Sequence, residues 1–189
     1  MNNMVNVISV ANQKGGVGKT TTTINLAASI ADRGYRVLIV DIDPQGNATS
    51  GLGIEKSEID QDIYNVLIDE IPIQDTIHHT STPKLDMVPA TINLSGAETE
   101  LISMMARETR LKSALDAISD QYDFVFIDCP PSLGQLSINA FTASDSILIP
   151  VQSEYYAMEG LSQLLNTIRL VQKHFNKDLG VEGVLLTML

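Results

Sequence analysis

The chain has 189 residues, of which 44% are apolar and 19% charged, and its formal net charge is −11. This length predicts one domain, and a chain of this size buries about 70% of its unfolded surface. The acidic excess argues against broad nucleic-acid binding and against adsorption to anionic membranes, because both draw on clustered Lys and Arg. The single cysteine, Cys129, excludes an internal disulfide. With no signal peptide and no apolar run long enough to span a membrane, we expect a cytoplasmic protein.

A predicted strand, a glycine loop and a predicted helix follow one another near the start of the chain. Residues 5–11 form an apolar, β-branched run typical of a short buried strand, and residues 21–33 carry apolar side chains at helical spacing. The loop between them contains Gly15, Gly16 and Gly18, which would let backbone N–H groups converge on one concavity at the helix N-terminus. That order of elements is the context that a phosphate-binding loop requires.

The loop also carries the side chains that such a site needs. Lys19 would reach the β- and γ-phosphates of a nucleotide, and the Thr20 hydroxyl would hold Mg²⁺. In the usual pattern, G-x-x-x-x-G-K-[ST], a glycine stands where this chain has Gln13, and an extra lysine, Lys14, follows it. The residues predicted to contact the nucleotide are Lys14, Gly15, Gly16, Val17, Gly18, Lys19, Thr20 and Thr21.

The Lys14 variant, K-G-G-x-G-K-[ST], resembles the deviant Walker A motif of the ParA/MinD family of ATPases, and in particular of its Soj-like chromosome and plasmid partition proteins. The resemblance implies a domain that binds ATP and Mg²⁺ and forms a homodimer when ATP is bound. In that dimer Lys14 would cross the interface to the partner's phosphates and act as an arginine finger does. Lys14 and Lys19 are therefore expected to be catalytic.

A second apolar strand is predicted at residues 36–40, after a helix stop at Gly34, and it leads into Asp41 and Asp43. Carboxylates at the C-terminal end of a buried parallel strand are typical of a ligand crevice. Residues 41–47 read D-I-D-P-Q-G-N and closely match the switch I segment of the Soj-like proteins. By that resemblance Asp43 positions the attacking water, and both aspartates belong to the Mg²⁺ site, Asp41 by supporting the shell of the ion.

The stretch that follows is less informative. A turn is predicted at residues 51–53 and a short amphipathic helix around residues 63–70. His78 and His79 are adjacent, but two neighbouring histidines without a third ligand rarely make a metal site. Beyond them we predict a strand at residues 85–89, and two helices within residues 93–119 that meet near Arg107 and Glu108.

The strand predicted at residues 124–127 is followed by the last candidate ligand for Mg²⁺. Its four apolar residues followed by Asp128 form a Walker B pattern, so Asp128 would hold a water bound to Mg²⁺. A proline pair then forces the chain out of the strand, and residues 130–134 would be switch II. The predicted metal site therefore comprises Thr20, Asp41, Asp43 and Asp128.

Three further elements complete the pattern: a strand at residues 147–151, a helix at 161–175 and a strand at 183–189. Arg169, Lys173 and Lys177 recur at four-residue steps on one helical face, which is more often a solvated face than a DNA contact. Strands alternating with helices predict an α/β fold of the P-loop NTPase type, with a doubly wound, mostly parallel sheet flanked by helices.

The resemblance spans the whole chain, residues 1–189, as a single domain, and residues 154–157 and 185–188 also look like Soj-like segments. Family members generally continue for some tens of residues past the last predicted strand, so we expect a form truncated at the C-terminus. The implied partners are a centromere-binding ParB-like protein and non-specific DNA, with nucleoid association at full length. This form is expected to bind DNA weakly and to bind no membrane.

Three other functions compete with a partition ATPase of slow turnover. A membrane-recruited division-site regulator of the MinD type needs a C-terminal basic amphipathic helix, and the Pro-Gln-Gly-Asn segment favours the Soj-like side. An iron–sulfur reductase of the nitrogenase iron-protein type needs four thiolates, more than one cysteine per subunit of a dimer supplies. A nucleotide-gated adaptor would lack a water-positioning carboxylate, whereas Asp43 is present.

Overall fold

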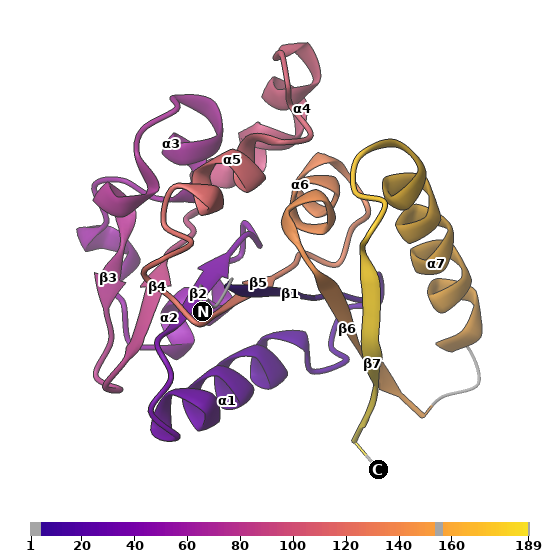
Figure 1. Cartoon of the computed structure of the whole chain (residues 1–189), viewed down its shortest axis with the longest axis horizontal. Helices are drawn as coiled ribbons and strands as arrows, with labels where there is room; N and C mark the ends of the chain where they lie inside the picture. Colours follow the sequence, from indigo (N-terminus) through magenta and orange to yellow (C-terminus); the bar gives the residue numbers. More distant parts are fainter. Residues whose placement is uncertain (1–4, 154–156, 189) are drawn as a thin grey trace.

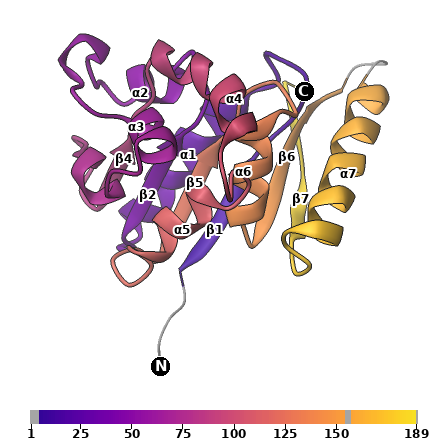
Figure 2. The ribbon, with the colours of Figure 1, turned by 90° about the horizontal axis from the view of Figure 1, so that it is seen from above.

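The structure is a computed structural model that describes residues 5–153 and 157–188. These residues form a seven-stranded sheet with helices on both of its faces (Figures 1 and 2). The strands lie in the order β3-β4-β2-β5-β1-β6-β7, and every neighbouring pair is parallel except β3 and β4. The predicted doubly wound, mostly parallel α/β fold is therefore confirmed.

The bounds of the elements, in chain order within each class, are as follows. The strands are β1 Asn6–Val10, β2 Val37–Asp41, β3 His78–His79, β4 Leu85–Val88, β5 Phe124–Asp128, β6 Ser146–Gln152 and β7 Gly180–Thr187. The α-helices are α1 Lys19–Asp32, α2 Asn47–Gly51, α3 Ile63–Ile68, α4 Ala97–Glu100, α5 Arg110–Asp116, α6 Gln135–Ala143 and α7 Ala157–His174. Short 3₁₀ turns lie at Lys56–Glu58, Ile73–Thr76, Ile92–Gly96 and Leu101–Ser103.

The centre of the sheet is covered on both faces, which explains its continuous apolar sequences. All five residues of β2 are buried, and β5 beside it is buried from Val125 onward. On one face lie α3 to α7, and on the other lies α1 with the short α2, so that two separate apolar cores flank the sheet. Figure 1 shows α1 below the sheet and α3 to α6 above it.

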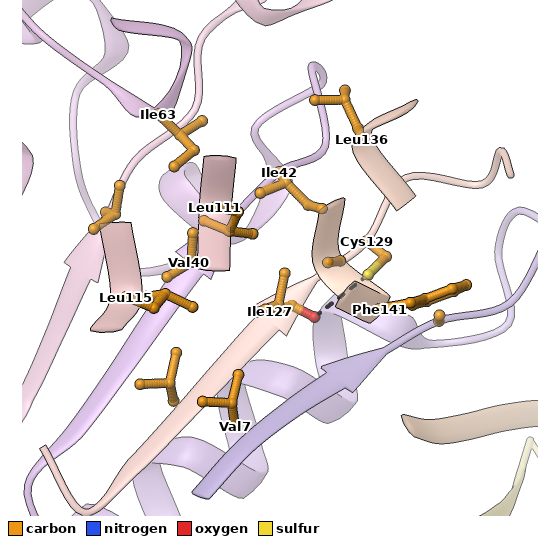
Figure 3. Close-up of a cluster of buried hydrophobic side chains, with 14 of the residues drawn as sticks. Val7, Val40, Ile42, Ile63, Leu111, Leu115, Ile127, Cys129, Leu136 and Phe141 are labelled. Carbon is orange, nitrogen blue, oxygen red and sulfur yellow. Dashed lines mark hydrogen bonds between the residues drawn. The ribbon is translucent and has the colours of Figure 1, made fainter. Parts of the chain in front are cut away.

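The larger core joins the sheet to α5 and α6. Figure 3 shows residues from the ends of β2 and β5 facing residues of these two helices, among them Val40, Ile127, Leu111, Leu115 and Phe141. The Cys129 thiol lies in this core, and its Sγ is 3.7 Å from the Ile127 carbonyl oxygen. Burial raises the pKa of the Cys129 thiol, which is only 1% exposed, so it packs as a small apolar side chain.

Two helices were not predicted from the sequence. The helix α6 begins after Gly134 and buries Leu136, Ala140 and Phe141, although polar residues separate them. The helix α2 covers part of the segment predicted as a turn, and only Leu52 and Gly53 follow it as a turn. Both helices owe their existence to burial against the sheet rather than to strong local propensity.

The segment 93–119 and the end of α7 also differ from the predictions. Two helices do lie in 93–119, but the first is short and flanked by 3₁₀ turns, and the break spans residues 104–109. The long helix α7 ends at His174, so Lys177 lies beyond it. The predicted three-cation face is therefore wrong, because only Arg169 and Lys173 belong to the helix. The predicted Soj-like segment 154–157 lies outside the described residues except for Ala157.

The edge strand β7 begins three residues earlier than predicted and carries exposed apolar side chains. Val181, Val184, Leu185 and Leu186 are 46%, 53%, 41% and 55% exposed.

Within residues 5–153 and 157–188, no helix combines the length and the apolar content needed to cross a bilayer.

Candidate functional site

The loop between β1 and α1 lies at the C-terminal edge of the sheet and is fixed from two sides. Asn12 donates from Nδ2 to the Pro150 carbonyl of β6 at 2.7 Å, and its Oδ1 accepts from the Lys14 N–H at 3.0 Å. On the far side, the Thr187 hydroxyl of β7 donates to the Val17 carbonyl at 2.8 Å. The loop is therefore held by the two strands that end beside it.

The start of α1 requires a glycine. Gly18 is the N-cap of the helix and has φ 88°, a left-handed conformation in which a side chain would be strained. Among the residues that the structure describes, no side chain caps the first turn of α1, so its N–H groups are left for another acceptor. This arrangement is the backbone basis of an anion site at the N-terminus of a helix of 14 residues.

Lys19 lies inside the loop rather than in solvent. Its residue is 7% exposed, and its Nζ donates to the Lys14 carbonyl oxygen at 2.9 Å. Burial lowers the pKa of Lys19, while the carboxylates of Asp128 and Asp43 act in the opposite direction. The ammonium is thus already positioned within the loop, at the point where the sequence predicted a phosphate contact. Lys14 is partly buried.

Asp128, the last residue of β5, contacts the start of α1. The Thr20 hydroxyl donates to Asp128 Oδ2 at 2.7 Å, and the Thr23 hydroxyl lies 3.2 Å from Oδ1. Burial raises the pKa of Asp128 to about 6, although both hydroxyls and Lys19 pull it downward. The structure therefore brings together Thr20 and Asp128, two of the predicted Mg²⁺ ligands.

Asp41 lies next to Asp128 in the sheet but faces the loop that follows β2. The two aspartates pair in register across β2 and β5. Asp41 is fully buried, and its Oδ2 accepts from the backbone N–H and the hydroxyl of Thr49, at 2.9 and 2.8 Å. Its Oδ1 accepts from the Asp43 N–H at 3.1 Å. All three bonds hold the segment 43–49, so the carboxylate of Asp41 acts as an internal brace of that segment.

The environment of Asp41 disfavours its charge. Burial and the neighbouring Asp128 raise the pKa of Asp41 to about 7, despite three hydrogen bonds to its carboxylate. A cation bound nearby would reverse this effect, because a positive charge favours the ionised form.

Asp43 is the remaining predicted metal ligand. It is 7% exposed, and its Oδ1 accepts from the Gln45 N–H at 2.9 Å. Gly46 then turns the chain with φ 59°, and a Cβ there would lie 2.6 Å from the Ala90 carbonyl oxygen. The segment therefore fits only with glycine at this position. Asp43 interacts electrostatically with both Lys19 and Asp128, which places all three in one cluster.

The donor set suits Mg²⁺ held jointly with phosphate oxygens. In the part of the chain that the structure describes, no three His, Cys, Asp or Glu side chains are grouped closely enough to hold an ion. Mg²⁺ keeps several waters and uses one or two carboxylates plus substrate phosphates, so a hydroxyl and a carboxylate fit it. Of the four predicted metal ligands, Thr20 and Asp128 are hydrogen-bonded to each other. The carboxylates of Asp41 and Asp43 instead accept from backbone N–H groups of the segment 43–49.

Several residues that shape the site were not predicted from the sequence. Thr23 follows Thr20 by three residues on α1, and this helical spacing could have indicated a second contact to Asp128. Thr49 and Asn12 act through backbone contacts across the sheet, and Thr187 reaches the loop from 170 residues away. No local sequence pattern predicts these contacts, because their partners are far away along the chain.

Comparisons with known proteins agree with this geometry. A family model described as an AAA domain matches residues 5–181. The chain is 63% identical to the sporulation initiation inhibitor protein Soj of Bacillus subtilis, over 98% of this chain and 74% of that protein. It is 57% identical to the chromosome partitioning protein ParA of Myxococcus xanthus, over 96% of this chain and 64% of that protein.

A solved structure has the same fold as this chain. It is that of cobyrinic acid a,c-diamide synthase from Mycobacterium smegmatis with a bound ATP analogue and magnesium, with a TM-score of 0.93 at 41% identity. The match covers 96% of this chain and 74% of that one. The partition proteins among the relatives favour the Soj-like alternative over the division-site regulator of the MinD type.

Proposed function

This chain belongs to the family of AAA-domain ATPases of the ParA/Soj type, and from that premise we propose that it is a partition ATPase. It binds Mg²⁺-ATP in the loop between β1 and α1, forms a homodimer when ATP is bound, and hydrolyses ATP slowly to drive segregation of chromosomal or plasmid DNA. The observation that carries the proposal is the cluster of Lys19, Thr20, Asp43 and Asp128 at one edge of the sheet.

The backbone and Lys19 are assigned to phosphate binding. The uncapped first turn of α1 supplies N–H donors, and Lys19, already within the loop, exchanges the Lys14 carbonyl for phosphate oxygens. Desolvation strengthens this contact because few waters compete for a cation that is 7% exposed. The solved relative from Mycobacterium smegmatis, which carries an ATP analogue and magnesium, supports the same ligand for this chain.

Thr20 and Asp128 are assigned to Mg²⁺. The ion would neutralise the charge that develops on the transferred phosphoryl group. The Thr20 hydroxyl would turn its oxygen to the ion, and Asp128 would accept from a water in the ion's shell. Thr23 would keep Asp128 in place, since its hydroxyl reaches the second carboxylate oxygen.

Asp43 is assigned to orienting the attacking water, and Asp41 to holding Asp43. The Asp41 carboxylate accepts the Asp43 N–H and so fixes the backbone from which the Asp43 side chain extends. Positioning of this kind by a general base contributes about 10²- to 10⁴-fold to a rate. Lys14 is assigned to the phosphates of the second subunit, where a cation contributes about 10³- to 10⁵-fold in other nucleotide hydrolases.

The partners proposed for the chain come from its relatives. Soj and ParA imply a centromere-binding ParB-like protein, and the ATP-bound dimer would bind non-specific DNA. Turnover of ATP should therefore rise when DNA and such a partner are added together.

The substitution Asp43→Ala tests the proposed chemistry. The variant should bind ATP as the parent does, lose about 100-fold or more in phosphate release, and accumulate as an ATP-bound dimer on a sizing column. Asp60→Ala, at an exposed aspartate outside the site, is the matched control and should leave turnover unchanged. Hydrolysis by Asp43→Ala at the parent rate would remove the water-positioning role from this residue.

A further inference from the structure

A groove outside the nucleotide site lies between α5 and the segment that follows α3. Its volume is about 640 Å³, within the range of pockets that accept ligands in proteins. Most of its walls are apolar, and they come from two stretches of chain that are about 30 residues apart or more. The residues on one side are Val66, Glu70, Ile71, Pro72, Ile73 and Gln74. None of the residues that line it belongs to the phosphate loop or to the segment 41–49.

A cation stands in the wall of this groove. The Arg110 side chain is only 13% exposed, and its Nη1 donates to the Leu67 carbonyl at 2.8 Å. Its Nη2 lies 2.7 Å from Glu70 Oε1, but the Glu70 side chain is 71% exposed. A largely buried guanidinium therefore has a counter-ion whose side chain lies mostly in solvent. A carboxylate entering the groove could take the place of Glu70 without leaving Arg110 unpaired.

The rim of the groove exposes large apolar side chains. Met105, which lines the groove, is 87% exposed, and Ile102 just before it is 58% exposed. Exposed Met and Ile beside an apolar pocket are typical of a surface that another protein covers.

Glu70 and Ala106 line the groove with φ of 58° and 53°, a backbone conformation that costs free energy for residues other than glycine.

One wall of the groove is fixed in advance. The Asn139 side chain of α6 is fully buried; its Nδ2 donates to the Arg107 carbonyl at 2.7 Å and its Oδ1 accepts from the Leu111 N–H at 3.2 Å. These two bonds hold the turn before α5 and the first turn of that helix. A ligand would therefore meet an ordered wall and would lose less free energy in ordering it.

We propose that this groove is the docking site for a short segment of a partner protein, which places aliphatic side chains between α3 and α5 and one carboxylate on Arg110. The carboxylate displaces Glu70, and Met105 closes over the aliphatic side chains. Charge complementarity selects an acidic segment, because the largely exposed Glu70 can turn into solvent whereas the Arg110 guanidinium is held in the wall by the Leu67 carbonyl. The exposed Met105 and Ile102 favour a protein partner over a small molecule confined to the groove.

The test uses two matched peptides, acetyl-Leu-Glu-Ala-Leu-amide and its Glu→Gln counterpart, titrated into the ¹⁵N-labelled full chain. The acidic peptide should shift the amide signals of Ala106, Ser113 and Ala114, and should bind about tenfold more tightly than the neutral peptide. Glu70→Gln removes the internal competitor and should tighten binding of the acidic peptide by up to about fivefold.

Two substitutions on α5 separate the specific contact from a general charge effect. Arg110→Gln should abolish the preference for the acidic peptide, whereas Lys112→Gln, at an exposed cation paired with Asp116, should leave it unchanged. The Glu70→Gln result stands even where Arg110→Gln fails to fold. Equal binding of both peptides, absence of shifts in the groove, or weaker binding by Glu70→Gln would overturn the proposal. These outcomes do not depend on ATP, so they are separate from the test of the proposed function.

Discussion

The substitution Thr49→Val tests whether the hydrogen bonds of Asp41 hold the segment 43–49 in place. Thr49 is fully buried; its hydroxyl donates to Asp41 Oδ2 at 2.8 Å and accepts from the Ala90 N–H at 3.0 Å. Valine keeps the shape but removes both bonds. Losing a hydrogen bond to a charged group costs about 1.5 to 3 kcal/mol, and the unpaired Ala90 N–H costs about 1 to 3 kcal/mol more. We therefore expect the free energy of unfolding to fall by about 4 kcal/mol.

The chain contains a matched control for this experiment. Thr142 in α6 is 2% exposed, and its Oγ1 has no hydrogen-bond partner among the described residues. Thr142→Val should therefore be neutral or stabilising, within about 1 kcal/mol of the parent. Urea unfolding followed by far-ultraviolet circular dichroism at pH 8, without nucleotide, gives both values. If the two variants have the same free energy of unfolding, the bonds of Thr49 do not hold the segment as described.

Two further predictions concern charges in the site. Lys14→Gln should bind ATP as the parent does but lose ATP-dependent dimerisation and about 10³-fold or more in turnover, measured by sizing and phosphate release; unchanged turnover would make Lys14 an ordinary loop residue. Without nucleotide and Mg²⁺, the pKa values of Asp41 and Asp128, about 7 and about 6, exceed their ordinary 3.8. The folded chain then binds more protons than the unfolded chain, so each carboxyl lowers the free energy of unfolding by up to about 1.4 kcal/mol per unit as pH rises from about 4 to its folded pKa. The stability of the parent relative to Asp128→Asn should fall over this range, and a difference that is constant or grows with pH would contradict the assignment.

The fold could be predicted from the sequence where apolar runs and glycines coincide. The strands β2 and β5 read as continuous apolar segments up to their terminal aspartates because both faces of the sheet are covered there. The helix α6 could not be predicted, because its buried residues are separated by Ser137 and Asn139, which point to other elements rather than to solvent. The two-residue strand β3 depends on its antiparallel neighbour β4 and has no periodicity of its own.

Within the site, the sequence indicated residue types better than it indicated what each carboxylate contacts. Lys19, Thr20 and Asp128 were predicted from motif spacing, and the structure brings them together. Asp41 was predicted to support the metal, but only the fold shows that its oxygens contact Thr49 and the Asp43 N–H. The difference arises because the partners of Asp41 lie two and eight residues further along the chain, and a linear motif does not record how that loop folds back onto the carboxylate.

The central claim, that the loop between β1 and α1 binds the phosphates of ATP, is tested most directly by calorimetry of Mg²⁺-ATP binding to Lys19→Ala. Lys19 is the buried cation inside the loop, and Lys173→Ala, at an exposed position on α7, is the matched control. The account predicts that Lys19→Ala binds at least about 100-fold more weakly than the parent, since a desolvated charge-assisted contact is lost, and that Lys173→Ala binds as the parent does. Binding by Lys19→Ala within about threefold of the parent would contradict the account.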